Sequence, residues 1–333
     1  MRFLIIQTAF PGDVILATSV TEKLHQHFPD ALIDFLLRRG NENILQNNPV
    51  IGDIISWDKN QNKFSGLLKI ISIIRKKKYD TVINLHRFAS SGLITAFSGA
   101  SQKIGFNKNP LSLFFTNKFK HDIGNGKHET ERNHELIKHL TDENVVKPKL
   151  YPGKNDFATV DKIRDQHSEP YICIGPAAVW FTKQLPEEKW VQLINQLPAN
   201  ISVYLIGSKA DTVLCENIKS HVSQKKFQLT QNLAGQLSFL ESAALMKGAL
   251  MNFVNDSAPL HLASAVNAPV TAVFCSTIPA FGFGPLSDKS RIVETKIKLD
   301  CRPCGLHGYK ACPLGHFNCA LTIEVDEMVV SLK

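Results

Sequence analysis

Short apolar runs alternate with amphipathic stretches along the whole chain. Runs of about four to eight mostly apolar residues are typical of strands buried in a parallel sheet. In the first half these candidate strands span residues 2–7, 31–37, 51–57, 80–86 and 103–106. The stretches between them carry apolar residues at helical spacing and predict helices over 14–27, 64–77, 90–98 and 129–140.

The alternation pauses over residues 145–170, where three prolines and many charges indicate a linker with one short helix. It then resumes, with candidate strands at 171–176, 201–207, 227–230, 249–256 and 269–275 and helices near 187–197, 211–222, 237–247 and 257–266. Two such series predict an α/β protein with two domains, 1–155 and 156–333, each built on a parallel sheet. Because ligands bind beyond the carboxyl ends of such strands, two facing domains would enclose a cleft.

Composition agrees with a soluble globular protein, because 44% of the 333 residues are hydrophobic and 20% are charged. The sequence has no run of about 18 apolar residues and no convincing secretory signal, so we expect a cytoplasmic location. The net charge of +8 arises partly from Arg and Lys at 75–78. These cations either complement the dipole of a helix end or attract anionic lipid head groups or a phosphorylated substrate.

Several common site motifs are absent from the sequence. It contains no G-x-G-x-x-G that opens a helix, no G-x-x-x-x-G-K-[ST], no D-x-D pair and no G-x-S-x-G. A nicotinamide-binding Rossmann site and the usual manganese site of many sugar-nucleotide transferases are therefore unsupported. We expect no cofactor.

The stretch NFVNDSAPLHLASA (252–265) joins an apolar strand to a helix. Asp256 or Ser257 can cap that helix, and Pro259 is tolerated in its first turn. His261 lies four residues after Ser257 and therefore on the same helix face. A helix start with free N–H groups, a hydroxyl and a histidine suits a phosphate, and plain capping beside a surface histidine is the alternative.

Two further strand–helix junctions carry candidate ligands. In GPAAVWFTKQLPEEKW (175–190) a small-residue loop presents Thr182 and Lys183, and Lys183 either enters the same site or is a solvated lysine. Asp211 opens a helix soon after the strand that ends at Gly207. It could hold ribose hydroxyls, although N-capping alone is the more usual role.

In the first half, Asp13 follows Pro-Gly in TAFPGDVILATS (8–19), directly after the first apolar run. A carboxylate there either caps a helix or faces a ligand at the end of the sheet. Position 16 is Leu, so no capping box accompanies it. Four basic residues lie at or just past the ends of other strands and suit carboxylates or phosphates, unless they are solvated surface cations: Arg38, Arg39, His86 and Arg87.

Taken together, these motifs resemble glycosyltransferase family 9, the ADP-heptose:lipopolysaccharide heptosyltransferases. FPGDVILATSV (10–20) resembles the N-terminal Gly-Asp-hydrophobic motif of the family, and residues 175–190 resemble its donor loop. NDSAPLHLASAVNAPVTAVF (255–274) resembles the signature Asp-[Ser/Thr]-Gly-x-x-His. CRPC…C…C followed by ALTI resembles the tail of the heptosyltransferase II branch.

The resemblance implies a GT-B fold, with two Rossmann-like domains whose parallel sheets face an interdomain cleft. It places the acceptor on the first domain and the nucleotide sugar on the second. It also implies an inverting, metal-independent transfer of heptose from ADP-heptose to the lipopolysaccharide inner core, by a peripheral enzyme at the inner face of the cytoplasmic membrane. Asp13 would be the general base, and Lys183 would stabilise the leaving diphosphate.

The resemblance also distributes the binding roles. The implied donor-binding residues are Thr182, Asp211, Asp256, Ser257, Ala258 and His261, and the implied acceptor-binding residues are Arg38, Arg39, His86 and Arg87. The chain departs from the family signature at Ala258, where the family has Gly, and at Pro259, which has no N–H to offer a phosphate. A helix N-terminus is expected to lower the pKa of Asp13.

Three alternatives stay open. A related transferase could use another nucleotide sugar, or the protein could bind a sugar nucleotide without turnover. A third reading, a basic zinc-braced module that binds nucleic acid, lacks aromatic residues interleaved with basic ones. We therefore expect no nucleic-acid partner.

The segment 301–319 holds four of the seven cysteines in a C-x2-C-x7-C-x6-C spacing, together with two histidines. A zinc site at Cys301, Cys304, Cys312 and Cys319, reduced structural thiols and disulfides are the three readings, with reduced thiols preferred because only one C-x2-C pair is present. We expect this segment to brace the chain where it crosses back toward the first domain. The other three cysteines, at 173, 215 and 275, are expected in the core.

Overall fold

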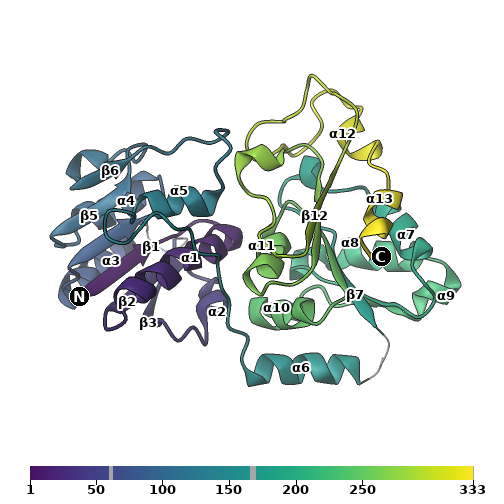
Figure 1. Cartoon of the computed structure of the whole chain (residues 1–333), viewed down its shortest axis with the longest axis horizontal. Coiled ribbons are helices and arrows are strands. Elements are labelled where there is room, and N and C mark those ends of the chain that lie inside the picture. Colours follow the sequence, from purple (N-terminus) through teal and green to yellow (C-terminus); the bar gives the residue numbers. More distant parts are fainter. Residues whose placement is uncertain (60–62, 166–169, 333) are drawn as a thin grey trace. The chain divides into compact units, whose positions relative to one another are not determined.

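The structure is a computed structural model that describes residues 1–59, 63–165 and 170–332. It contains two compact units, Met1–Tyr151 and Pro152–Lys333, drawn from purple to teal and from teal to yellow in Figure 1. The boundary expected from the sequence lay after residue 155. Each unit is built on a six-stranded sheet.

The sheet of the first unit has the order β3-β2-β1-β4-β5-β6, and its pairs are parallel. Its strands are β1 (Arg2–Ile6), β2 (Leu32–Arg38), β3 (Ile51–Trp57), β4 (Thr81–Asn84), β5 (Gln102–Phe106) and β6 (Asn117–Phe119). The apolar runs predicted the first five. The sixth has only three residues, Asn-Lys-Phe, and therefore no apolar run to signal it.

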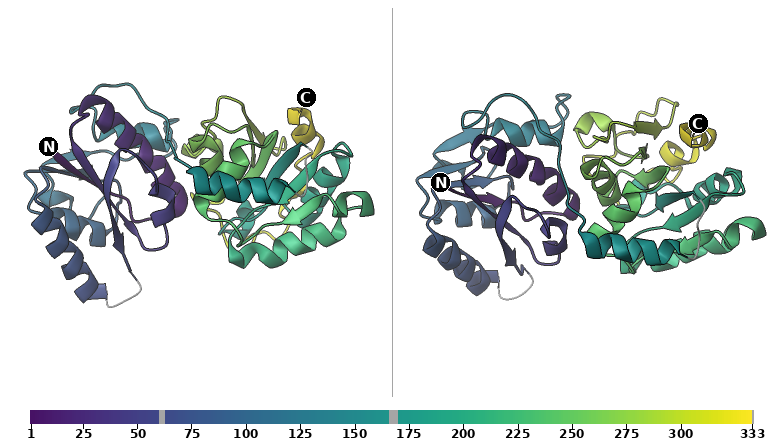
Figure 2. Two further views of the ribbon diagram at one scale, coloured as in Figure 1. Left: turned by 90° about the horizontal axis from the view of Figure 1, so that it is seen from below. Right: turned by 60° about the horizontal axis from the view of Figure 1, so that its bottom comes forward.

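Helices cover both faces of this sheet, with α1 and α3 on opposite sides in Figure 2. They are α1 (Pro11–His27), α2 (Glu42–Leu45), α3 (Lys63–Lys77), α4 (Ala89–Ala96) and α5 (Glu129–Glu135), with a 3₁₀ turn at Ser112–Phe114. Leu67, Ile70 and Ile74 of α3 pack on alternate sheet residues such as Leu4 and Ile6. Helix α5 ends earlier than predicted, because the N–H groups of Leu136 and Ile137 bond three residues back instead of four.

Helix α1 is buried over most of its surface, because the sheet lies on one side and α5 and the segment before Tyr151 lie on the other. Its interior hydroxyls find partners within the helix: Thr18, Ser19 and Thr21 donate to carbonyl oxygens three residues earlier. The Lys149 N–H also donates to the Thr18 hydroxyl at 2.9 Å. These contacts fix the helix, and with it the position of its N-terminus at the end of β1.

The second unit has a parallel sheet of order β12-β11-β10-β7-β8-β9. Its strands are β7 (Tyr171–Gly175), β8 (Ser202–Leu205), β9 (Thr230–Asn232), β10 (Met251–Asn255), β11 (Val270–Phe274) and β12 (Ser290–Glu294). The third strand begins at Thr230, three residues later than predicted, because Gln224–Phe227 forms a short helix. No apolar run in the sequence predicted β12, an edge strand with a single buried residue, Val293.

Two helical layers enclose this second sheet. The helices are α6 (Lys154–Arg164), α7 (Glu187–Gln196), α8 (Thr212–His221), α9 (Gln224–Phe227), α10 (Phe239–Lys247), α11 (Ala258–Ala265), α12 (Asn318–Leu321) and α13 (Asp326–Val329). Helix α10 packs against α6 and α11, whereas α7 packs against α8 and α13. Among the residues described, no helix combines the length and apolar character needed to span a bilayer.

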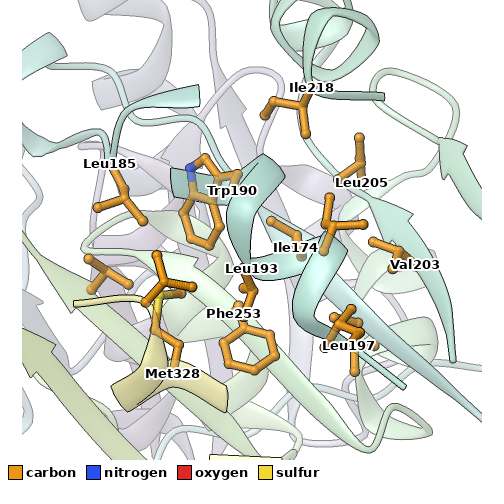
Figure 3. Packing of buried hydrophobic residues seen from close by; sticks show 14 of the residues in the cluster. Ile174, Leu185, Trp190, Leu193, Leu197, Val203, Leu205, Ile218, Phe253 and Met328 are labelled. Carbon is orange, nitrogen blue, oxygen red and sulfur yellow. The ribbon is translucent and has the colours of Figure 1, made fainter. Parts of the chain in front are cut away.

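The core beneath α7 is shown in Figure 3. Trp190 and Leu193 of α7 are fully buried and pack with Phe253 of the central strand β10. Met328 of α13 joins the same cluster, so the end of the chain completes the core of this unit.

Removing the Phe253 ring from this core by Phe253→Ala should lower the free energy of unfolding by about 3–5 kcal/mol, because apolar contacts are lost and a cavity remains. Urea denaturation measures the change. The control is Val213→Ala at a side chain that is 70% exposed, where we expect a change within about 0.5 kcal/mol. Equal effects of the two substitutions would contradict the packing described.

Candidate functional site

Both sheets place their first strand in the centre, beside their fourth. The chain leaves β1 toward one edge of the sheet and leaves β4 toward the other, and the same holds for β7 and β10. In open α/β sheets, ligands bind at the carboxyl ends of two strands whose connections diverge in this way. The residues that follow these four strands are therefore the candidates in each unit.

Asp13 follows β1 and is the third residue of α1, which begins at Pro11 rather than at residue 14 as predicted. The Phe10 N–H donates to Asp13 Oδ2 at 3.2 Å. Asp13 therefore satisfies one free donor at the helix start, although it is not the N-cap residue itself. Its side chain keeps some solvent exposure although the surrounding protein desolvates the carboxyl group, so capping leaves it accessible to a ligand.

The pKa of Asp13 is raised to about 6, chiefly by burial and next by the nearby Glu129 carboxylate. The Phe10 N–H and the charge of Arg87 oppose this rise but do not cancel it. The expected lowering by the helix N-terminus is therefore wrong, because desolvation outweighs it. A carboxylate with this pKa is ionised at neutral pH and is a stronger base than an ordinary aspartate.

Glu129 is buried at the start of α5, which packs against α1. Arg132 Nε donates to its carboxylate at 2.7 Å, and His121 Nε2 lies 3.4 Å away. Burial alone would raise the pKa of Glu129, but the His121 hydrogen bond and the Arg132 charge bring it below its usual value. Glu129 therefore keeps a negative charge near Asp13. The sequence indicated only a helix here.

The loops after β1 and β4 meet through two side chains. His86 Nδ1 lies 3.2 Å from Thr8 Oγ1, and the His86 N–H donates to Asn84 Oδ1 at 2.9 Å. Burial and the charges of Lys59 and Arg87 lower the pKa of His86 to about 3. The imidazole is therefore neutral at pH 7, so it can form a hydrogen bond with a ligand but carries no positive charge.

Lys59 belongs to this group, although the sequence analysis missed it. Its Nζ donates to the Thr8 carbonyl at 2.8 Å and lies 5.0 Å from the centre of the Trp57 ring. Burial and the charge of Arg38 lower the pKa of Lys59 to about 8. Lys59 lies two residues after a predicted strand, and this position is the only feature of the sequence that could have identified it as a site residue.

The four predicted basic residues differ in their surroundings. Arg38 acts electrostatically on Lys59, and Arg87 acts on both Asp13 and His86. These groups therefore form one cluster. Arg39 points elsewhere, because its Nη1 donates to Asp58 Oδ2 at 3.1 Å and its side chain is 64% exposed.

In the second unit, Asn255 at the end of β10 organises the donor loop, defined here as residues 176–185. Its Nδ2 donates to the Pro176 carbonyl at 2.6 Å, and its Oδ1 accepts the Leu185 N–H at 3.0 Å. One buried amide thus holds both ends of the loop. The feature of the sequence that could have identified Asn255 is its position as a polar residue at the end of an apolar strand.

The structure brings together two residues that the sequence analysis selected separately. Lys183 Nζ lies 2.8 Å from Asp256 Oδ2, and both side chains are largely buried. The Thr277 hydroxyl donates to the same oxygen at 2.7 Å. This ion pair lies where the loops after β7 and β10 diverge.

Helix α11 begins beside this ion pair, at Ala258. The Ser257 hydroxyl donates to the Asn255 carbonyl at 3.4 Å and makes no capping bond. Pro259 packs over Gly175, where an added Cβ would lie 3.1 Å from Pro259 Cβ. His261 is buried rather than on the surface, with its ring edge-on to Phe283.

Two other predicted donor ligands bond within the protein. Asp211 Oδ2 accepts the Ser208 N–H and hydroxyl, both at 2.7 Å, as the third residue of a 3₁₀ turn. It makes no N-cap bond at the start of α8, where the sequence favoured one. Thr182 is buried, and its Oγ1 accepts the Tyr309 N–H at 2.8 Å. Their contacts with a donor stay predictions.

All seven cysteines are free thiols, and those at 173, 215 and 275 are fully buried, as expected. Across the described ranges, no three His, Cys, Asp or Glu side chains are grouped so that they could hold a metal ion. Within 301–319, Cys301 Sγ lies 3.8 Å from His316 Nε2, and the Phe317 N–H donates to Cys312 Sγ. The Phe317 ring stacks on Phe181, so the segment braces the donor loop of its own unit.

Comparison with known proteins agrees with this architecture. The model of glycosyltransferase family 9 (heptosyltransferase) matches residues 67–308. Lipopolysaccharide heptosyltransferase 3 of Escherichia coli is 29% identical over 283 residues, which cover 80% of this chain and 82% of that protein. Lipopolysaccharide heptosyltransferase 2 of Escherichia coli K12 is 23% identical over 308 residues, 88% of each chain.

Among solved structures, the ADP-heptose lipopolysaccharide heptosyltransferase II of Escherichia coli aligns with a TM-score of 0.82 at 21% identity and covers 100% of this chain and 98% of that one. A family 9 glycosyltransferase from Veillonella parvula gives a TM-score of 0.86 at 20% identity, with 99% and 95% covered. The predicted GT-B fold is confirmed by this likeness. Because the family model matches well over half of the chain, the protein belongs to glycosyltransferase family 9 and is a glycosyltransferase.

Proposed function

We propose that the protein transfers heptose from ADP-heptose to the lipopolysaccharide inner core, with inversion at the anomeric carbon and with Asp13 as general base. The relatives named above are lipopolysaccharide heptosyltransferases, and one of them is described by its ADP-heptose donor. The observation that carries the proposal is the setting of Asp13, whose pKa is raised to about 6 at the carboxyl end of the central strand.

In this mechanism the acceptor binds to the first unit with its nucleophilic hydroxyl at Asp13. As the hydroxyl oxygen bonds to the anomeric carbon, its proton becomes acidic and passes to the carboxylate. Lys59, Arg38 and Arg87 supply positive charge for carboxylates or phosphates of the acceptor. Neutral His86 supplies a hydrogen bond.

The second unit holds the nucleotide sugar. The bond between the anomeric carbon and the diphosphate breaks, and the charge that develops on the leaving ADP needs fixed positive groups. Lys183 provides one by moving its ammonium from Asp256 to a phosphate oxygen. The start of α11 and His261 provide hydrogen-bond donors, and Asp256 then becomes free to accept a sugar hydroxyl. These groups supply the positive potential without a metal ion.

We also propose that the enzyme works at the cytoplasmic face of the inner membrane, where its acceptor is anchored. Arg75, Lys76 and Lys78 are exposed at the end of α3 and suit anionic head groups. Lys77 has another role, because it pairs with Asp34 at 3.0 Å.

The donor is tested with a panel of nucleotide sugars and truncated lipopolysaccharide acceptors, with release of the nucleotide diphosphate as the readout. We expect ADP-heptose to give a kcat/KM at least about tenfold above that of other donors. Preference for another nucleotide sugar would support the related transferase instead. Donor binding without any release would support a protein that only binds.

The base is tested with Asp13→Asn, which keeps an oxygen for the Phe10 N–H but cannot take a proton. Turnover should fall about 10²- to 10⁴-fold, while ADP binding measured by calorimetry stays near that of the wild type. Asp156→Asn is the matched control, because Asp156 also occupies the third position of its helix and accepts the Gly153 N–H at 2.7 Å. Unchanged turnover of Asp13→Asn would leave Asp13 as a cap only.

The pH profile follows from the raised pKa. Because Asp13 must be ionised to act, kcat/KM should be low in acid and rise through about pH 6, and it should fall above about pH 8 as Lys59 loses its charge. Glu129→Gln removes the neighbouring negative charge and leaves Arg132 uncompensated, and both changes lower the pKa of Asp13. The acid limb should therefore move to lower pH, whereas Glu135→Gln at the other end of α5 should leave it in place. An unmoved limb in Glu129→Gln would contradict the coupling.

A further inference from the structure

The segment Cys301–Tyr309, here called the strap, lies against the donor loop of the second unit. We propose that the strap is a positioning element for the donor diphosphate: the backbone at Gly308 and Tyr309 clamps Thr182 and thereby fixes Lys183. This inference rests on the proposed donor role of Lys183. It also gives the Cys-rich part of the chain a function that requires no bound metal.

The clamp consists of two hydrogen bonds between the strap and one buried residue. The Thr182 N–H donates to the Tyr309 carbonyl at 3.1 Å, and the Tyr309 N–H donates to Thr182 Oγ1 at 2.8 Å. Thr182 is 1% exposed, so water does not compete effectively for these bonds. The residue that follows Thr182 is Lys183, whose ammonium pairs with Asp256.

Ser276 links the strap to the other half of the ion pair. Its hydroxyl lies 3.0 Å from Thr182 Oγ1, and its N–H donates to the Thr182 carbonyl at 3.2 Å. The Cys304 N–H of the strap donates to the Ser276 carbonyl at 2.8 Å. The next residue, Thr277, donates to Asp256. The strap thus contacts the neighbours of both charged groups.

Arg302 anchors the beginning of the strap to the sheet. Its guanidinium donates to the carbonyl oxygens of Cys275 at 2.7 Å and Thr277 at 2.8 Å, just beyond β11. It also pairs with Glu294 of β12 at 2.5 Å. Both carbonyl groups lie just past the last residue of β11, so one planar cation binds them together and fixes the strap there.

Gly308 allows the close approach at the other end. Its φ is +77°, and an added Cβ would lie 2.8 Å from Thr182 Oγ1 and 3.1 Å from both Lys183 Cγ and Ser276 Oγ. Any side chain at this position would therefore displace the donor loop. The bare backbone rests on the aliphatic stem of Lys183, which limits the positions of its ammonium before a donor arrives.

A comparison of Gly308 in the strap with Gly315 beyond it separates the effect of this contact from the effect of backbone strain. Gly308→Ala and Gly315→Ala both place alanine at a left-handed position, with φ +77° and +72°, but nothing lies within 4 Å of the added Cβ at Gly315. Both variants should lose thermal stability through backbone strain, and Gly308→Ala should lose more because its Cβ also collides with the donor loop. Only Gly308→Ala should raise the Kd for ADP and the KM for the donor, by about tenfold, with the acceptor KM unchanged.

A second pair of variants tests another contact that holds Thr182, the hydroxyl of Ser276, without backbone strain. Ser276→Ala removes the hydroxyl beside Thr182, and Ser202→Ala removes an equally buried hydroxyl from β8. We expect weaker ADP binding, measured by calorimetry, for Ser276→Ala alone. This pair decides the question if Gly308→Ala does not fold.

The outcomes separate the two proposals. Wild-type ADP affinity in Gly308→Ala or, where that variant does not fold, in Ser276→Ala overturns the positioning role and leaves the proposed transfer intact. Equal weakening by Gly308→Ala and Gly315→Ala also overturns it, because strain alone would then be the cause. A wild-type protein that binds no ADP and releases none from any donor contradicts the proposed function itself.

Discussion

The central position of the first strand in each sheet is the constraint on which both candidate sites depend. With β1 beside β4 and β7 beside β10, the loops that leave these strands turn away from each other at the carboxyl edge. Polar side chains then hold the diverging loops in place. Thr8 and His86 do so in the first unit, and Asn255 does so in the second. An apolar residue in place of Asn255 would leave the buried Pro176 carbonyl and Leu185 N–H without this partner.

In the first unit, groups of opposite charge act on the pKa of the same carboxylate, that of Asp13. Arg38, Lys59 and Arg87 would by themselves pull the pKa of a nearby carboxylate down. Burial of Asp13 and the fixed charge of Glu129 work in the opposite direction and prevail. A cluster that contains several cations can thus keep a carboxylate basic enough to accept a proton.

The sequence predicted features that depend on local pattern and missed those that depend on distant segments. Asp13, Lys183 and Asp256 were found because each follows an apolar strand. The raised pKa of Asp13 could not be predicted, because it depends chiefly on burial by segments distant in the sequence and next on a carboxylate of α5. Tyr309 meets Thr182 across 127 positions, and no spacing rule connects them.

The errors in the predicted bounds of single strands and helices have local causes. Strand β9 begins late because Gln224–Phe227 satisfies its backbone as a helix, and β12 is an edge strand whose polar residues hide its one buried position. Helix α5 ends early because the N–H groups of the next two residues bond three residues back instead of four, and composition does not reveal this change.

The ion pair between Lys183 and Asp256 has a consequence for selectivity among anions. A lysine that already has a partner gives up one favourable interaction for each new one it makes, so only the difference contributes to affinity. A lone small anion such as chloride or inorganic phosphate offers little beyond that exchange. A nucleotide sugar has two linked phosphates, a nucleoside at one end and a sugar at the other. Its additional contacts contribute to affinity even though Lys183 only exchanges one anionic partner for another. If Lys183 takes the donor role proposed above, its carboxylate partner therefore lowers the affinity of the site for simple anions.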